Sequence, residues 1–291
     1  MGSGEGGTVK VLVTGSDGFL GRHAVKTFLR LGHDVYGVDI QSGTDCRDVF
    51  DSDTYFDIVL HFAAIVGGRA TIDGNPLAVA QTMALDVALF NYAERVRPGH
   101  VIYPSSSAAY PVSLQTREHH EHLQEDHIDL QKPALPDAMY GWVKLTGEQM
   151  AARCSAPVTC LRPMSGYGSD QDTTYPFGAF RARALSRENP FVIWGDGTQV
   201  RDWVHVDDIM EAILSILTSE VTGPINIGTG IATDFLTLAE LFTSRSGYSP
   251  TVQTLPDKPT GVHYRVANVD RLHDFYIPRI SLEEGIERAM R

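Results

Sequence analysis

The sequence predicts an α/β fold, with a doubly wound, Rossmann-type parallel sheet and a smaller C-terminal lobe. Three observations support this prediction. Apolar strand-like runs alternate with helical patterns up to about residue 165, a glycine-rich turn follows the first run, and the alternation breaks from Gly166 onward. The 291 residues are many for one core and few for two independent ones, so we expect one main domain with an attached lobe.

Composition narrows the possible function classes. The chain is 43% hydrophobic and 21% charged, as in globular proteins, and its net charge of −12 without a basic stripe argues against nucleic acid. The sequence has no signal peptide and no long apolar span, and we expect a soluble, cytoplasmic protein that does not bind membranes. Cys46, Cys154 and Cys160 have no metal-ligand spacing and are expected to be reduced thiols. The glycine-rich residues 1–7 are expected to be disordered.

The first strand and helix enclose a phosphate-binding turn. Residues 9–13 form an apolar run, residues 22–31 have helical periodicity, and Gly15, Gly18 and Gly21 lie between them. Gly15 allows the tight turn, Gly18 lets the backbone approach a pyrophosphate, and Gly21 lets the helix lie close to the strand. The helix N-terminus then offers N–H groups to the anion. A flexible glycine loop is the alternative.

An acidic residue after the second strand favours a phosphate-binding turn over a flexible glycine loop. Residues 34–39 form this strand, and Asp39 lies 24 positions after Gly15, where a carboxylate can accept hydrogen bonds from the adenosine ribose. No Arg or Lys follows Asp39 directly, so a 2′-phosphate would meet negative charge. We therefore predict NAD rather than NADP as the cofactor. Arg22 could still favour NADP, because its side chain could reach toward a 2′-phosphate.

The alternation continues through the first half of the chain. A polar segment covers residues 41–48, helical periodicity covers 77–95 and 140–152, and strands are expected at 58–64, 101–107 and 158–162. In such sheets the ligand lies outside the carboxyl ends of the strands. Residues 61–64 and 105–107 fall at such ends.

The second half is less regular. We expect residues 8–165 to form the dinucleotide-binding domain, with residues 204–230 returning to it as a helix at 207–217 and a strand at 224–228. Residues 166–203 and 231–291 are expected to form the lobe, with isolated strand pieces such as 191–194.

The histidines at 119, 120 and 122 could suggest a metal site. No spaced carboxylate or cysteine set accompanies them, which favours a solvated loop and no metal.

Tyr140 and Lys144 form a candidate acid–base pair. Residues four apart lie on one face of a helix. A lysine ammonium near the phenol stabilises the phenolate and lowers its pKa, so that Tyr140 can exchange a proton with a carbinol or carbonyl. Alone this spacing is common and mostly structural, but here it lies downstream of the glycine turn and of a strand that ends in Ser105, Ser106 and Ser107.

Together these motifs resemble the extended short-chain dehydrogenase/reductases, in the NAD-dependent epimerase/dehydratase family that acts on nucleotide sugars. The resemblance covers nearly the whole chain after Val9 and is most characteristic at residues 195–208. It implies a catalytic set of Ser106, Tyr140 and Lys144. It also implies that Tyr140 and Lys144 contact the cofactor, together with Gly15, Asp17, Gly18, Phe19, Leu20, Gly21, Asp39, Asp45, Cys46, Phe62, Ala63, Ala64 and Pro163.

The resemblance also implies how the substrate is held. Ser107 and Ser165 would contact it, and Arg201 and Arg265 would bind its diphosphate, which suits the planar guanidinium fork. An ion pair of Arg201 with Asp202 or Asp207 is the alternative. Helices 77–95 and 140–152 match those through which relatives dimerise, so a homodimer is expected.

Departures from the family pattern narrow the chemistry. Ser107 and Ala108 stand where dehydratases of the family place an acidic pair, and C3/C5 epimerases place a cysteine at the position of Ala108. Ser165 replaces an Asn that contacts substrate in many relatives, and the segment between Asp39 and Asp45 is short. The resemblance thus favours C4 epimerisation through a transient 4-keto sugar. The alternatives are an NAD(P)H-dependent 4-ketoreductase of a 4-keto-6-deoxy nucleotide sugar and a non-catalytic NAD-binding sensor.

Overall fold

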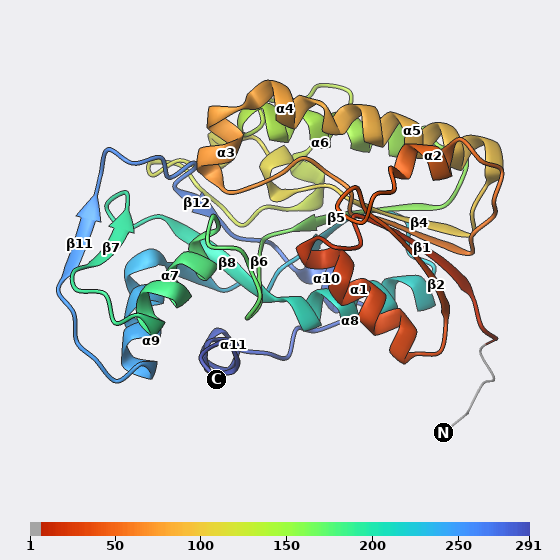
Figure 1. Ribbon diagram of the computed structural model, residues 1–291. Helices are drawn as coiled ribbons and strands as arrows, with labels where there is room; N and C mark the ends of the chain where they lie inside the picture. Colours follow the sequence, from red (N-terminus) through yellow and green to blue (C-terminus); the bar gives the residue numbers. More distant parts are fainter. Residues whose placement is uncertain (1–6) are drawn as a thin grey trace.

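A six-stranded, all-parallel sheet runs through the computed structural model, which describes residues 7–291 (Figure 1). The strand order is β2-β1-β3-β4-β5-β9, which confirms the predicted doubly wound architecture. Except for Gly7, the start of the chain that was expected to be disordered lies outside the described residues. The strands of this sheet are β1 (Lys10–Thr14), β2 (Asp34–Val38), β3 (Ile58–His61), β4 (His100–Pro104), β5 (Val158–Pro163) and β9 (Gly223–Ile227).

Helices cover both faces of the sheet (Figure 1). One face carries α1 (Phe19–Arg30), α8 (Val206–Thr218) and α10 (Asp270–His273). The other carries α2 (Cys46–Phe50), α3 (Arg69–Gly74), α4 (Pro76–Ala80), α5 (Thr82–Val96) and α6 (Ala138–Ala151). No helix in the described part of the chain has the length and apolar character needed to cross a bilayer.

The predicted elements differ from the observed ones in two places, both on the face of the sheet that carries α2 to α6. The single helix expected at 77–95 is two helices, because the backbone tightens at Gln81 into bonds of the i→i+3 kind, from Gln81 N to Ala78 O (3.1 Å) and from Ala84 N to Gln81 O (3.0 Å). The spacing of the apolar residues does not reveal this break between α4 and α5. The polar segment expected at 41–48 already contains the start of α2, whose first turn is capped by the Asp45 carboxylate.

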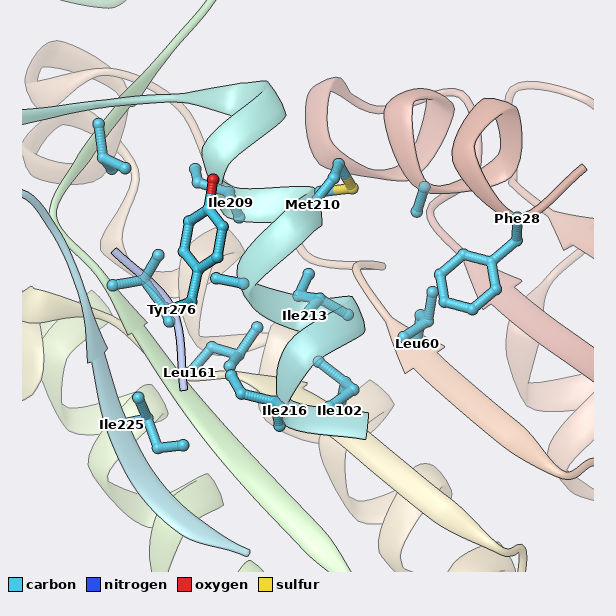
Figure 2. Packing of buried hydrophobic residues seen from close by; sticks show 14 of the residues in the cluster. Phe28, Leu60, Ile102, Leu161, Ile209, Met210, Ile213, Ile216, Ile225 and Tyr276 are labelled. Carbon is cyan, nitrogen blue, oxygen red and sulfur yellow. The ribbon is translucent and has the colours of Figure 1, made fainter. Parts of the chain in front are cut away.

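Helix α8 returns the chain to the main sheet, as expected for residues 207–217. Its apolar stripe places Ile209, Ile213 and Ile216 against the sheet, where all three are buried (Figure 2). Burying one such side chain contributes about 1.5–3 kcal/mol. The helix therefore anchors the second half of the chain to the central sheet.

The C-terminal half has its own sheets and core. Strand β8 (Val200–His205) pairs with β6 (Ser165–Tyr167), β10 (Ala232–Asp234) and β12 (Tyr264–Arg265). The strand expected at 191–194 is confirmed as β7 (Phe191–Trp194). It is not isolated, because it pairs in parallel with β11 (Val252–Leu255), 61 positions further along at each step. Aromatic side chains fill this core, and the helices over it are α7 (Pro176–Leu185), α9 (Phe235–Arg245) and α11 (Leu282–Ala289).

Candidate active site

The carboxyl ends of the central strands meet at one edge of the sheet. Because β1 lies between β2 and β3, the chain order reverses on either side of β1, and a crevice forms there in doubly wound sheets. The glycine turn follows β1, Asp39 follows β2, and residues 62–64 follow β3. Ser106 and Ser107 follow β4, and Pro163 ends β5.

The glycine turn has the shape of a phosphate cradle. Gly15 has a φ of +69°, and a Cβ placed there would lie 2.5 Å from the carbonyl carbon of Phe62. A Cβ on Gly21 would lie 1.9 Å from the oxygen of Gly15, so only glycine lets α1 approach this closely. Gly18 is the N-cap of α1 and provides no side chain to satisfy the N–H groups of Phe19 and Leu20. The turn therefore has room and donors for a pyrophosphate.

Asp39 is buried behind this turn. Its carboxylate accepts hydrogen bonds from the backbone N–H groups of Asp17 (3.1 Å) and Gln41 (2.9 Å). Arg22 does not point toward Asp39, because its guanidinium binds Asp170 through Nε (2.5 Å to the carboxylate) and Nη2 (2.7 Å to the carbonyl). This engagement removes the residue that the sequence offered as a partner for a 2′-phosphate.

Asp45 and Cys46 begin α2 beside the short segment after Asp39. The Asp45 carboxylate accepts from the Arg47 backbone N–H (2.9 Å) and pairs with the Arg47 guanidinium (2.5 Å), which lowers its pKa. The Cys46 side chain is buried in the core, and burial raises the pKa of its thiol to about 11. A contact with adenine at this place would therefore use the Cys46 backbone and an Asp45 carboxylate that Arg47 already holds.

Backbone hydrogen bonds and strand pairing hold the residues that follow β3 and end β5 at the carboxyl edge of the sheet. The Ala63 N–H donates to the Thr14 hydroxyl (3.3 Å) and the Phe62 N–H to the Thr14 carbonyl (2.9 Å), which fixes residues 62–64 beside the glycine turn. Pro163 lies opposite Ile227 in the pairing of β5 with β9, and Ser165 begins β6. Ala64 and Ser165 are partly buried.

Ser106, Tyr140 and Lys144 come together across two elements. Ser106 caps a short 3-10 helix, Ser107–Ala109, where its hydroxyl accepts from the Ala108 N–H (3.0 Å). Tyr140 and Lys144 lie one turn apart on α6, whose Asp137 N–H donates to the Ala108 carbonyl (2.9 Å). Helix α6 starts two residues earlier than expected, at Ala138.

The electrostatics of this group differ from the expectation in one respect. Burial raises the pKa of Tyr140, and the nearby Asp86 carboxylate raises it further, while a hydrogen bond with the Ser106 side chain acts in the opposite direction. Lys144 Nζ lies 5.9 Å from the centre of the Tyr140 ring and does not produce the expected lowering. Burial lowers the pKa of Lys144, whose Nζ is buried without a hydrogen-bond partner. A buried ammonium without a partner fits a site where ribose hydroxyls of a dinucleotide would bind.

Arg201 and Arg265 are brought together by the small sheet. They are paired in register on β8 and β12. Burial lowers the pKa of Arg201 to about 9, and the Arg265 charge acts in the same direction. Burial also lowers the pKa of Arg265. Both guanidinium groups nevertheless remain charged at neutral pH. The alternative, an ion pair of Arg201 with Asp202 or Asp207, is wrong. The Asp202 carboxylate accepts instead from the Thr229 (2.8 Å) and Gly230 (3.0 Å) N–H groups, and Asp207 pairs with Arg288 (3.3 Å).

Arg69 and Asp137 belong to the same charged group and were missed from the sequence. The Asp137 carboxylate pairs with Arg265 (2.9 Å) and with Arg69 (2.6 Å). Arg69 begins α3 directly after Gly67 and Gly68. A cation that follows two glycines near the end of a central strand is the signal that could have identified it.

The histidine-rich loop packs against residues 264–267, beside Arg265. The His120 ring packs on Tyr264, with 4.4 Å between ring centres, and His122 Nδ1 lies 3.1 Å from the Ala267 carbonyl. Between residues 7 and 291, no three His, Cys, Asp or Glu side chains are grouped as a metal site would require.

Comparison with known proteins identifies a family and a fold. The model of the NAD dependent epimerase/dehydratase family matches residues 11–228. A putative UDP-glucose 4-epimerase of Methanocaldococcus jannaschii is 28% identical, with 96% of this chain and 97% of that protein covered. GDP-mannose 3,5-epimerase of Arabidopsis thaliana is 24% identical, with 96% of this chain and 80% of that protein covered.

Solved structures match over almost the entire chain. UDP-glucuronic acid 4-epimerase from Bacillus cereus, crystallised with UDP-glucuronic acid and NAD, has a TM-score of 0.83 at 24% identity, covering 97% of this chain and 98% of that one. UDP-glucose 4-epimerase from Thermus thermophilus, in complex with NAD, has a TM-score of 0.81 at 21% identity, covering 97% of each chain. At these identities the two structures establish the shared fold.

Proposed function

Because the chain belongs to the NAD-dependent epimerase/dehydratase family, we propose that it is a nucleotide-sugar epimerase acting at C4 through a transient 4-keto sugar. One observation carries the proposal. Ser106, Tyr140 and Lys144 gather at the carboxyl edge of the sheet, while the next two positions, Ser107 and Ala108, provide neither a carboxylate nor a thiol. These residues suffice for proton exchange at a single carbinol.

Each of the three residues has a defined task in this reaction. Tyr140 removes the proton of the C4 hydroxyl and later returns it to the 4-keto oxygen, and Ser106 hydrogen-bonds the same oxygen. Lys144 holds the cofactor ribose and provides a positive charge near the phenol. NAD, when bound, would supply the acceptor and donor of the C4 hydride, and the overall reaction would be redox-neutral.

Ala108 argues against epimerisation at C3 and C5, although one relative bears that activity in its name. Such a reaction exchanges protons on carbon and needs an acid–base group on each face of the sugar. The Ala108 methyl group cannot exchange a proton, and its side chain is buried against α6. The 4-epimerase name of another relative agrees better with this site.

We assign nucleotide-sugar recognition to the C-terminal lobe, residues 166–203 and 231–291, with residues 8–165 and 204–230 holding NAD. Arg201 and Arg265 are the candidate ligands of the substrate diphosphate, and Ser107 and Ser165 are candidate contacts of the sugar. This group contains three arginines, Arg69, Arg201 and Arg265, and the carboxylate of Asp137. The more exposed Asp73 also pairs with Arg69, and the group still has excess positive charge. A dianionic diphosphate would compensate that excess.

The proposal includes a homodimer in the cytoplasm. Leu77 on α4, Val87 on α5 and Trp142 on α6 are large apolar side chains exposed on neighbouring helices, as expected for a subunit contact. Cys46, Cys154 and Cys160 are free thiols, which agrees with a reducing compartment.

The test begins with purified protein and a thermal-shift panel of UDP-, GDP-, CDP- and dTDP-sugars. A true ligand stabilises the folded state by about 2.7 kcal/mol at a hundredfold excess over its Kd. The stabilising sugar is then incubated in D₂O, and its products are analysed by NMR. We expect tightly bound NAD, a C4 epimer and no deuterium on carbon, because the C4 hydrogen returns without exchange.

Other outcomes would identify other functions. Consumption of one NADH or NADPH per product from a 4-keto-6-deoxy sugar would establish the ketoreductase instead. Deuterium at C3 or C5 would contradict the assignment to C4. Bound NAD with no turnover of any nucleotide sugar would favour a sensor.

A further inference from the structure

A second group of charged and polar side chains lies beneath the catalytic pair, in the interior of the protein. Asp86, in the middle of α5, is completely buried. The Tyr103 hydroxyl on β4 donates a hydrogen bond to Asp86 Oδ2 (2.7 Å), and His61 Nε2 on β3 lies 3.4 Å from Asp86 Oδ1. A buried carboxylate is costly unless cations or donors compensate it.

The other end of this group reaches the glycine turn. His61 Nδ1 lies 2.8 Å from the Thr14 hydroxyl, which also accepts the Ala63 N–H. Burial lowers the pKa of His61, so the ring is neutral. A neutral ring that accepts from Thr14 at Nδ1 carries its proton on Nε2, facing Asp86. The ring thus stands between the Asp86 carboxylate and Thr14, the residue that precedes the glycine turn.

Three unpartnered atoms mark the same place. Among the buried side-chain atoms without a hydrogen bond in residues 7–291 are His61 Nε2, Asp86 Oδ1 and Lys144 Nζ. The Lys144 ammonium lies 4.9 Å from the centre of the Tyr103 ring, whose hydroxyl binds Asp86. The Lys144 ammonium and the Asp86 carboxylate therefore both contact Tyr103.

The other groups around Lys144 carry no charge. Burial raises the pKa values of Tyr103, Tyr140 and the Cys160 thiol on β5, and it lowers that of His61. Lys144 therefore depends on Asp86 as its counter-charge. The titratable groups facing Lys144 are Asp86 on α5, His61 on β3, Tyr103 on β4, Cys160 on β5 and Tyr140 on its own helix.

We propose that Asp86 is a positioning residue of the reaction: its buried carboxylate keeps Lys144 charged and sets the pH range in which the Tyr140–Lys144 pair works. The inference rests on the proposed function for its catalytic meaning, but the Asp86–Lys144 coupling can be measured without turnover. The Asp86 charge raises the pKa values of both Lys144 and Tyr140, because a nearby negative charge favours the ammonium and disfavours the phenolate. Loss of that charge moves both titrations to lower pH.

The experiment replaces Asp86 with the isosteric Asn and follows the Lys144 side chain by NMR in protein labelled with ¹³C-lysine. The Lys144 resonance is assigned by its absence from Lys144→Arg. We expect it to titrate about one pH unit lower in Asp86→Asn than in the wild type. Tyr103→Phe, which leaves the carboxylate in place, is the matched control and is expected not to lower the titration. Equal titrations in the wild type and Asp86→Asn would overturn the proposal.

A reciprocal measurement keeps the proposal testable if Asp86→Asn does not fold. Coupling is symmetric, so Lys144→Met must move the titration of the Asp86 carboxyl carbon upward. An unchanged Asp86 titration in that variant would overturn the coupling.

Activity then provides a separate readout. In Asp86→Asn both limbs of the pH–kcat profile move toward lower pH, whereas a merely structural role lowers kcat at all pH values without moving the profile. If the pH–kcat profile of Asp86→Asn coincided in pH with that of the wild type, the catalytic part of the inference would be overturned. A measured Asp86–Lys144 coupling in a protein that turns over no nucleotide sugar would support the electrostatic role and contradict the proposed function.

Discussion

Arg201 and Arg265 stand opposite each other in the parallel pairing of β8 and β12, but they have different partners. Arg265 binds the Asp137 carboxylate (2.9 Å), whereas the hydrogen bonds of Arg201 within the described residues go to backbone carbonyls, such as that of Thr260 (3.0 Å). A buried guanidinium without a carboxylate is available for an anionic ligand. The pair therefore combines one free cation with one that Asp137 holds in position.

Arg201→Gln is expected to weaken binding of the nucleotide sugar while leaving NAD bound. Hydrogen bonds to charged groups contribute about 1.5–3 kcal/mol, so KM should rise by about 10- to 100-fold. Steady-state kinetics and the fraction of bound NAD measure the two effects. Arg117→Gln removes an exposed cation paired with Asp196 and should leave KM unchanged. An Arg201 variant with normal KM would disprove its role in substrate binding.

Asp137 should make stability depend on pH in the acid range. Burial alone would raise the pKa of its carboxyl, but Arg265 and Arg69 outweigh this and hold the pKa below its ordinary value. Stability from these ion pairs is therefore present above the ordinary carboxyl pKa, near pH 4, and is lost as pH falls further through the lowered pKa.

Asp137→Asn should cost about 3 kcal/mol at neutral pH and flatten this acid dependence. Urea unfolding at several pH values measures both. Inorganic pyrophosphate should stabilise the variant more than the wild type, because Arg69 and Arg265 lose their carboxylate. Asp53→Asn, at an exposed pair with Arg95, is the control and should change neither. Parallel pH curves for the wild type and Asp137→Asn would contradict the prediction.

Tyr140→Phe should abolish turnover and leave cofactor binding intact. Removing a general acid–base group costs about 10²–10⁴-fold in kcat, while the ring that packs near Lys144 remains. Single-turnover kinetics and the amount of co-purified NAD check the two parts. Tyr36→Phe, at a half-exposed tyrosine on β2, should behave as the wild type. Retained turnover in Tyr140→Phe would favour the sensor.

Sequence patterns predicted the central sheet well because its determinants are local. Buried strands and amphipathic helices leave periodic signals, and the i,i+4 spacing alone placed Tyr140 and Lys144 on one face of α6. The pairing of β7 with β11 joins distant segments and leaves no such signal.

Asp86 was missed for a similar reason. In an apolar helix, one carboxylate looks like a solvent-facing residue, and only the packing of α5 against the sheet and α6 places it beside His61 and Tyr103. Likewise, Arg69 and Arg265 are almost 200 positions apart and share Asp137 only in the folded chain.

The proposed subunit contact is tested by sedimentation. The exposed fractions of Leu77, Val87 and Trp142 are 77%, 41% and 38%, which is large for apolar side chains on adjacent helices. We expect a dimer for the wild type and a shift toward monomer for Val87→Arg, because burying an unpaired charge in an apolar contact is costly. Leu31→Arg changes an exposed residue at the end of α1, a helix on the opposite face of the sheet (Figure 1), and should leave the dimer intact. A monomeric wild type would refute the proposed contact.

Glu148 on α6 and Arg162 on β5 form an ion pair that joins this helix to the sheet. Both side chains are almost completely buried, and the Glu148 carboxylate binds Arg162 at 2.6 Å and accepts from the Ser105 hydroxyl. Glu148→Gln leaves the guanidinium buried without its counter-charge, which costs about 3–5 kcal/mol. Replacing both partners with apolar residues, Glu148→Leu with Arg162→Met, should cost less than the single change, because no charge is then left buried. Calorimetry on the single and double variants measures the difference, and a double variant less stable than Glu148→Gln would show that the pair contributes more than charge compensation.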